Sequence, residues 1–462
     1  MKTSTKLGER PIGRLLFTMS IPAIFSMLVQ ALYNIIDSYF VSKIGSEALN
    51  SVSLSFPLQM IVTAVAIGLG IGVNSLISRK KGAGEDEEAN QAAKTSILLA
   101  IILGIVFVVL GLTIPRLFLS SMTDNETVVE LGTGYLTIIL SLSFFVIMEI
   151  TLTRILQAVG NMIIPMLCQL LGAITNIILD PILIFNAGMG VRGAAAATII
   201  GQGLALVLAI SVFIFRKQEI NISLRNFKFK LEHVKGILVV GLPVTIMNSI
   251  GSITTMTMNT VLNNYHLTLD DAEAAVNVLG VYFRLQSFVF MPIFGLTQGG
   301  MPILGYNYGA NKKKRYVKTV KYILITSLII FGVGFVVFQT IPHLLLSIFH
   351  PTELMMSIGV RALRIISLCF IPVGFGIVFA NVFQSLGHGF KSLAMTLFRQ
   401  LIVLIPTALI LTIYTGVNNI WYAYGIAELM ATLVFTPIAI YTINKQFRIR
   451  DYQLSSLKEL AS

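Results

Sequence analysis

The sequence predicts an all-α membrane protein with twelve transmembrane helices, arranged as two six-helix bundles related by an internal repeat. Three observations lead to this fold class. The composition is strongly apolar, the apolar residues form twelve long runs, and the second half of the chain repeats the first. Of the 462 residues, 55% are hydrophobic and only 12% are charged, whereas soluble domains carry about 25% charged residues.

Each of the twelve apolar runs is long enough to cross a hydrocarbon core of about 30 Å. None shows the alternating pattern of a membrane β-strand, so helices are expected. The first run is too long for a cleavable signal peptide and leads directly into further spans. The expected spans are residues 14–40, 49–77, 95–115, 131–155, 162–185, 193–215, 236–262, 275–303, 320–342, 357–384, 392–414 and 419–444.

The internal repeat appears when residues 48–201 are shifted by 227 positions along the chain. Each half holds an even number of helices, so the second half enters the membrane from the same side as the first, and the repeat is parallel. The expected domains are a bundle over 1–215, a linker over 216–235 and a second bundle over 236–462. The matched pairs include Gln59/Gln286, Gly68/Gly295, Gly72/Gly299, Gly82/Gly309 and Gln157/Gln384, and Pro22 matches Pro243 at a shift of 221.

The net charge of +12 is explained by membrane topology. When loops are assigned alternately to two sides, most of the 33 Lys and Arg residues fall on the side of the N-terminus. This asymmetry predicts that both termini are cytoplasmic. The basic tract Lys312–Arg315 belongs to this pattern, so no nucleic-acid partner is expected. Only Arg154 and Arg284 are expected to remain inside the membrane.

The sequence shows no chemistry typical of an enzyme. Cys168 and Cys369 lie in apolar runs, the five histidines are scattered, and no phosphate-binding glycine loop is present. We therefore expect neither an enzymatic activity nor a bound cofactor. Two similar hydrophobic halves are instead a common plan for secondary transporters, with the substrate path between the halves.

Ionisable residues inside a membrane span are costly and mark functional sites. Helix rise places Asp37 and Asp180 at a similar depth, in the half of the membrane far from the termini, together with Asn176 and Thr198. Two carboxylates with amide and hydroxyl oxygens suit H⁺ or Na⁺, so these four residues are the predicted cation-coupling site. The alternative is that they cap helix ends or contact headgroup water.

This polar cluster is not repeated in the second half. The positions equivalent to Asp37, Asn176, Asp180 and Thr198 are Met258, Val403, Thr407 and Gly425. The asymmetry argues against a purely architectural role.

Five further residues are candidates for a substrate cavity. They are Asn34, Glu149, Met256, Arg284 and Glu428. Met256 belongs to a stretch of adaptable apolar residues that could equally face lipid or pack inside the bundle. Glu428 could instead form an ion pair with an arginine such as Arg284 or Arg364, and Arg154 is expected to extend toward the membrane surface.

Several motifs resemble the MATE (multidrug and toxic compound extrusion) family, and most closely its prokaryotic MepA-like branch. They occur in order along essentially the whole chain. The motifs are Gln30-Ala-Leu-Tyr-Asn-Ile-Ile-Asp37, the run from Ala48 to Gln59, Gln157-Ala-Val-Gly-Asn161 with Pro165, Asn176 with Asp180-Pro181, Gly193-Ala-Ala-Ala-Ala-Thr198 and Gly305-Tyr-Asn-Tyr-Gly-Ala310.

The resemblance implies export of lipophilic, cationic drugs or dyes in exchange for H⁺ or Na⁺, by alternating access of two bundles. The expected location is the inner membrane of a prokaryote, and nothing in the sequence requires more than a monomer. In related members a first-half cation site uses residues that match Asp37, Asn176, Asp180 and Thr198. Members with carboxylates on helix 7 are matched poorly, since this chain has none there.

Two other transporter classes are alternatives. A flippase for lipid-linked oligosaccharides, from the same superfamily, would need several cavity arginines for its diphosphate cargo. A major-facilitator transporter would show inverted three-helix subrepeats and a characteristic loop after helix 2. In this chain that loop is Arg79-Lys-Lys-Gly-Ala-Gly-Glu-Asp-Glu-Glu88, which lacks the expected arrangement.

Overall fold

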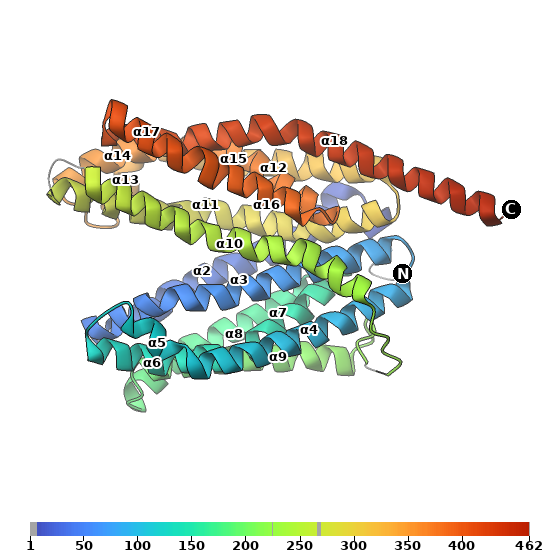
Figure 1. The fold of residues 1–462 in the computed structure, drawn as a ribbon, viewed down its shortest axis with the longest axis horizontal. Coiled ribbons are helices and arrows are strands. Elements are labelled where there is room, and N and C mark those ends of the chain that lie inside the picture. Colours follow the sequence, from blue (N-terminus) through green and yellow to red (C-terminus); the bar gives the residue numbers. More distant parts are fainter. Residues whose placement is uncertain (1–6, 224, 266–268, 462) are drawn as a thin grey trace.

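The computed structural model describes residues 7–223, 225–265 and 269–461, and every regular element in these ranges is helical. Figure 1 shows two bundles lying side by side along one common axis. The first contains α2 (Ile12–Ser42), α3 (Ser46–Gly82), α4 (Asp86–Thr113), α5 (Pro115–Ser120), α6 (Glu126–Ser141), α7 (Phe144–Ala158), α8 (Ile163–Pro181), the π-helix η1 (Ile182–Asn186) and α9 (Val191–Phe215).

The second bundle repeats this order. It contains α10 (Leu231–Tyr265), α11 (Leu269–Gly309), α12 (Lys313–Thr340), α13 (Pro342–Ser347), α14 (Glu353–Ser367), α15 (Phe370–Ser385), α16 (Gly389–Leu397), the π-helix η2 (Phe398–Leu404), α17 (Ile405–Thr415), η3 (Val417–Asn419) and α18 (Tyr422–Ala461).

The predicted membrane helices are confirmed. Eleven helical segments of the described chain are long and apolar enough to cross a bilayer, and the bent pair α14 and α15, with an angle of 50° between them, makes twelve. Each predicted span lies within one of these segments, apart from a few residues at span ends. The observed helices extend further than predicted at the end that carries the basic residues, because polar turns there continue the helices beyond the apolar core.

Exposed apolar side chains on these helices are numerous enough to form a lipid-facing surface. Such extensive apolar exposure would be unfavourable in water and is expected for a surface in contact with lipid tails. Examples from both bundles are Phe17, Leu112, Ile214, Ile329 and Leu433, each more than 60% exposed.

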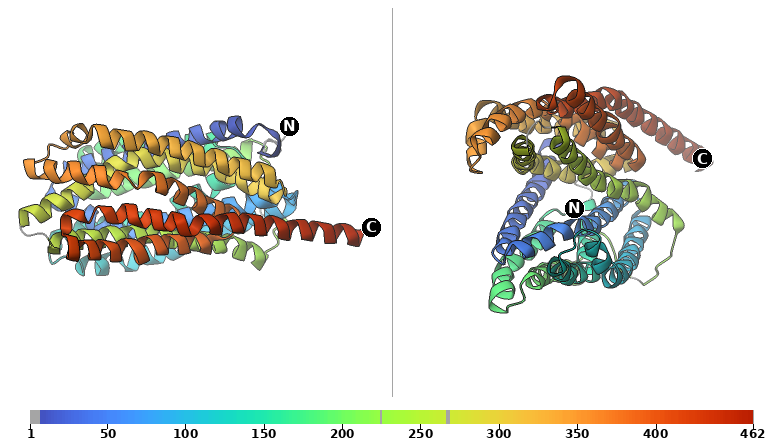
Figure 2. Two further views of the ribbon diagram at one scale, coloured as in Figure 1. Left: turned by 90° about the horizontal axis from the view of Figure 1, so that it is seen from above. Right: turned by 60° about the vertical axis from the view of Figure 1, so that its left-hand side comes forward.

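Both chain termini lie at the same end of the molecule (Figures 1 and 2), as an even number of helices per half requires. We call this the terminal end, and the other the opposite end. Residues 216–230 connect the bundles at the terminal end, where the backbone N–H of Lys228 donates to Gln91 Oε1 (2.9 Å). Glu88 accepts from Lys230 (2.5 Å) and lies 2.9 Å from His233 Nε2. The linker is therefore held against the first turns of α4.

The two bundles contact each other through the terminal half of the molecule. Ser75 Oγ donates to the Gln384 carbonyl oxygen (2.6 Å), and Arg315 donates to the Arg10 carbonyl oxygen (2.8 Å). Among the described residues, the direct hydrogen bond between bundles that lies farthest from this end joins Thr245 to the carbonyl oxygen of Ala64, near mid-depth. Beyond this depth the bundles separate toward the opposite end (Figure 1).

We call this contact surface between the two bundles the seam. Repeated glycines form it with approximate two-fold symmetry. Gly82 of α3 packs against the backbone of Tyr306 in α11, and its repeat partner Gly309 packs against the backbone of Arg79 in α3. The contacted residues, Arg79 and Tyr306, are themselves repeat partners at the shift of 227. Small residues allow such close backbone contact between membrane helices, which explains why these glycines recur in both halves.

This geometry predicts that Gly82→Ala will disrupt the seam. A methyl group at Gly82 would overlap the Tyr306 carbonyl oxygen, whereas one added at Gly332, on α12, would meet open space. Disulfide cross-linking of a Ser78→Cys/Gly305→Cys pair should report closure, because these residues touch across the seam. Gly82→Ala should lower the cross-linking yield several-fold and Gly332→Ala should not. An equal yield in both variants would contradict this account.

Candidate functional site

The first bundle contains a buried polar cluster built on α8 and α9. Asn176 and Asp180 lie one turn apart on α8, and Asn176 Nδ2 donates to Asp180 Oδ1 at 3.2 Å. The same amide nitrogen lies 3.2 Å from Thr198 Oγ1 on α9 and donates to it. Asp180 is fully buried, and Asn176 and Thr198 are nearly so. Three of the four residues predicted for cation coupling are thus in direct contact.

Two glycines explain how α8 and α9 come close enough for this contact. Gly172 lies one turn before Asn176, and Gly201 lies one turn after Thr198. A Cβ atom at Gly201 would lie only 2.6 Å from the Gly172 carbonyl oxygen, so the helices approach backbone to backbone at this point. Pro181 lacks an N–H group, and the π-helix η1 begins directly after it. The local sequence therefore fixes where the site forms.

Asp37 joins the cluster from α2. Its carboxyl group lies close enough to the Asp180 carboxyl group for the two to interact electrostatically. Two carboxyl groups can share a hydrogen bond only if one carries a proton. Asp37 Oδ1, Asn176 Oδ1 and Asp180 Oδ2 are buried and have no hydrogen-bond partner among the described residues. These oxygens could accept a proton or coordinate a hard cation such as Na⁺.

Two tyrosines complete the surroundings of the cluster and are absent from the predicted set. Tyr33 lies one turn before Asp37 on α2 and close to Thr198. Tyr135 of α6 donates to Gln59 Oε1 of α3 at 3.1 Å. The i, i+4 spacing of Tyr33 and Asp37 could have indicated the first, whereas Tyr135 carries no local sequence signal.

Three of the four equivalent positions in the second bundle carry no polar side chain, and the fourth, Thr407, has a single hydroxyl group. Met258 is fully buried in the hydrophobic core of that bundle, and Val403 packs against the same core. A Cβ atom at Gly425 would have no neighbour within 4 Å. The scaffold is repeated, but the oxygen cluster occurs in the first bundle alone.

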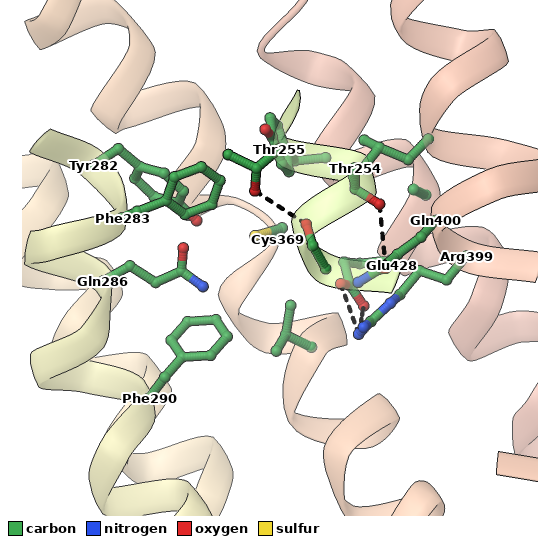
Figure 3. A pocket seen from close by; sticks show the side chains of 15 residues that line it. Thr254, Thr255, Tyr282, Phe283, Gln286, Phe290, Cys369, Arg399, Gln400 and Glu428 are labelled. Carbon is green, nitrogen blue, oxygen red and sulfur yellow. Dashed lines mark hydrogen bonds and ion pairs between the residues drawn. The ribbon is translucent and has the colours of Figure 1, made fainter. Parts of the chain in front are cut away.

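The predicted cavity residues differ in their burial. Asn34, Met256 and Arg284 are exposed, and Glu149 is partly buried on α7. Glu428 lines a cavity inside the second bundle (Figure 3).

Two expectations about arginines were wrong. Glu428 pairs with Arg399, at 3.0 Å between Nη1 and Oε1, and not with Arg284 or Arg364. Arg399 was not among the arginines expected inside the membrane, but it lies inside the span Gly389–Thr415. Arg154 does not extend to the membrane surface. It donates to Gln157 Oε1 (3.1 Å) and, with the Gln298 amide turned to face it, to Gln298 Oε1 of the other bundle (2.5 and 2.9 Å).

Comparisons with known proteins agree with this architecture. The MatE family model matches residues 22–182 and again 243–410, so the family unit occurs twice and covers more than half of the chain. The multidrug export protein MepA of Staphylococcus aureus strain MRSA252 is 25% identical over 447 residues, covering 96% of this chain and 97% of MepA. MepA of Staphylococcus saprophyticus is 26% identical over 436 residues, covering 94% and 95% of the two chains.

Solved structures show the same fold. An outward-facing structure of a multidrug resistance MATE family transporter has a TM-score of 0.90 and 28% identity, covering 96% of this chain and 98% of that one. A transporter of the MOP superfamily from Pyrococcus furiosus gives a TM-score of 0.89 and 29% identity, with coverage of 96% and 98%. The two six-helix bundles, the doubled family match and these structural likenesses together show that the chain belongs to the MATE family of membrane transporters.

Proposed function

We propose that this protein is a secondary antiporter that exports lipophilic, cationic drugs or dyes in exchange for H⁺ or Na⁺. The observation that carries the proposal is the buried oxygen cluster of Asp37, Asn176, Asp180 and Thr198. Its unpartnered oxygens suit a small cation, and the repeat provides the matching scaffold without the cluster in the second bundle. The multidrug export activity in the names of the staphylococcal relatives supports the substrate class.

The seam between the bundles indicates which conformation the structure represents. The bundles are joined at the terminal end and separate toward the opposite end. The excess of basic residues supports a cytoplasmic position for the terminal end, in the inner membrane of a prokaryote. With that orientation, the conformation is outward-facing, with the cytoplasmic side closed.

Exchange follows if ion binding favours one conformation over the other. A ligand shifts such an equilibrium only through a difference in its affinity for the two states. Entry of a cation neutralises the repulsion between Asp37 and Asp180 and ties α2 to α8, the two helices that supply the carboxylates. We propose that this ordering favours drug release to the outside, and that loss of the ion on the inside resets the carrier. A monomer is sufficient for this cycle.

A flippase for lipid-linked oligosaccharides is a weaker candidate. The structure adds Arg399 to the embedded arginines, which would favour an anionic cargo. However, Arg399 is paired with Glu428, and its charge is thereby neutralised. Arg399 therefore does not supply the uncompensated positive charge that a diphosphate would need.

Dye accumulation in a bacterial host that lacks its own efflux pumps tests the proposed function. Cells that make this protein should accumulate several-fold less of a lipophilic cationic dye than cells with an empty vector. Collapsing the H⁺ and Na⁺ gradients should remove the difference, whereas depleting ATP with the gradients held should not. Export that continues without any ion gradient would exclude secondary antiport.

Thiol labelling in intact cells tests the proposed orientation. Native Cys168 and Cys369 are buried and give little background. A cysteine at Asp271, at the opposite end, should react with an impermeant thiol reagent, and a cysteine at Lys313, at the terminal end, should react only after the cells are permeabilised. Positions Ser4 and Ser456 serve the same purpose, although Ser4 lies outside the described residues. Labelling of Lys313→Cys from outside would reverse the topology.

A further inference from the structure

The second bundle contains a cavity of about 270 Å³. Residues from α10, α11, α15, η2 and α18 line it (Figure 3). A buried water occupies about 30 Å³ of liquid volume, and drug-sized pockets begin near 300 Å³. The cavity is therefore larger than a structural water site and smaller than a typical drug pocket.

The internal repeat explains why the cavity exists. At the shift of 227, Arg399 and Glu428 are equivalent to Gly172 and Gly201, the two glycines that bring α8 and α9 together in the first bundle. Two long charged side chains occupy the positions of two hydrogen atoms, so the helices of the second bundle cannot make the same backbone contact. The π-helical turn of η2 carries both Arg399 and Gln400, and π-helical turns often occur at functional sites.

A second difference between the repeats leaves a polar atom beside the cavity without a partner. In the first bundle, Gln59 Oε1 accepts a hydrogen bond from Tyr135. Their repeat partners are Gln286 and the buried Ala362, so the tyrosine hydroxyl group has no counterpart. Gln286 Oε1 consequently has no hydrogen-bond partner within the described part of the chain, and the same is true of Tyr424 Oη. Both residues line the cavity, and Figure 3 shows Gln286 between the rings of Phe283 and Phe290.

A buried polar atom without a partner costs about 1–3 kcal/mol, so Gln286 Oε1 and Tyr424 Oη are available to hydrogen-bond a ligand in the cavity. The charges define that ligand. A simple cation would meet Arg399 as well as Glu428, and a simple anion would meet Glu428 as well as Arg399. A molecule with both charges close together can lie antiparallel to the pair, with its carboxylate at the guanidinium group and its ammonium at the Glu428 carboxylate.

We propose that this cavity binds a compact aromatic zwitterion of about the size of an aromatic amino acid. Gln286 Oε1 accepts from the ammonium group, Tyr424 Oη donates to the carboxylate, and the rings of Phe283 and Phe290 contact the aromatic group. Thr254 Oγ1 donates to Gln400 Oε1 at 3.2 Å and holds that side chain at the cavity wall. The role of this cavity as a substrate subsite rests on the proposed export function. Binding of the zwitterion does not depend on that function, because binding requires no ion gradient.

Equilibrium dialysis of radiolabelled tryptophan against the purified full-length protein tests this proposal. Tryptophan methyl ester lacks the negative charge, and N-acetyltryptophan lacks the positive charge. Both should compete at least about tenfold more weakly than unlabelled tryptophan, because each loses a charge-assisted hydrogen bond. Equal competition by the ester or the N-acetyl compound would overturn the proposal, and so would no measurable tryptophan binding at millimolar concentrations.

Matched variants locate the site without breaking the ion pair. Gln286→Leu should weaken tryptophan binding about tenfold or more. The control Gln202→Leu, which also removes an unpartnered glutamine oxygen but in the first bundle, should leave it unchanged. The double variant Arg399→Gln/Glu428→Gln avoids an unpaired buried charge and should abolish the preference for the zwitterion. A preference that persists in the double variant would place the binding site elsewhere.

The coupling variant Asp37→Asn separates this proposal from the export function. Asp37 lies in the other bundle, so the variant should bind tryptophan with wild-type affinity even where dye export is lost. Failure of tryptophan binding together with normal export of a cationic dye would refute the cavity assignment alone. Loss of tryptophan binding in Asp37→Asn would also count against a separate second-bundle site.

Discussion

Replacing Asp37 with asparagine is expected to reduce gradient-driven export to the background level. Asparagine has nearly the same size as aspartate and can donate a hydrogen bond to Asp180, so the fold should be preserved. It cannot bind a proton in the relevant range, and it removes one of the two charges that attract a cation. The exchange cycle therefore loses the ion that drives it, although the drug can still bind.

Dye transport into inverted membrane vesicles measures this effect. The variant should be present in the membrane at wild-type levels and should bind dye with unchanged affinity. Glu428→Gln is the comparison in the opposite bundle and should have a milder effect on coupling, because Glu428 lies away from the cluster. Wild-type export with unchanged ion dependence in Asp37→Asn would show that coupling takes place elsewhere.

Asp180→Asn is expected to have the second largest effect. Asp180 is fully buried and accepts a hydrogen bond from Asn176, and asparagine can accept the same bond. The change removes the second charge of the pair, so Asp37 can no longer share a proton with a neighbouring carboxyl group. Export should fall to nearly the same low level as in Asp37→Asn.

Ion titrations of the export rate distinguish the charged from the neutral residues of the cluster. Asn176→Ala and Thr198→Ala each remove a neutral side chain, and a lost hydrogen bond or neutral ligand costs about 0.5–1.5 kcal/mol. These variants should need several-fold more driving ion to reach half-maximal rate, with a maximal rate close to wild type. The carboxylate variants should instead lose the maximal rate. A common behaviour in all four variants would indicate a structural role.

The fold was predictable from the sequence because a helix that crosses the hydrocarbon core needs a long run of apolar residues, and such runs are visible in the sequence. The runs around Asp37 and Asp180 are apolar over enough residues that no alternative to a transmembrane helix exists. The depth of the cluster followed from helix rise, and its confinement to one half followed from the repeat.

The partners of Arg399 and Tyr135 were not predictable in this way. Arg399 lies near the predicted edge of its span, and its ion pair depends on how η2 and α18 pack, which local sequence does not specify. Tyr135 is brought near Gln59 by the packing of α6 on α3. The repeat did contain one usable signal. Gly172 and Gly201 are replaced by a basic and an acidic residue at equivalent positions, which could have indicated the ion pair.

The most direct test of cation-coupled export through the first-bundle cluster is dye transport in proteoliposomes under a Na⁺ gradient and a pH gradient applied separately. The account predicts that at least one gradient drives transport by the wild-type protein and that neither drives transport by Asp37→Asn. Gradient-driven transport by Asp37→Asn at the wild-type rate would contradict it.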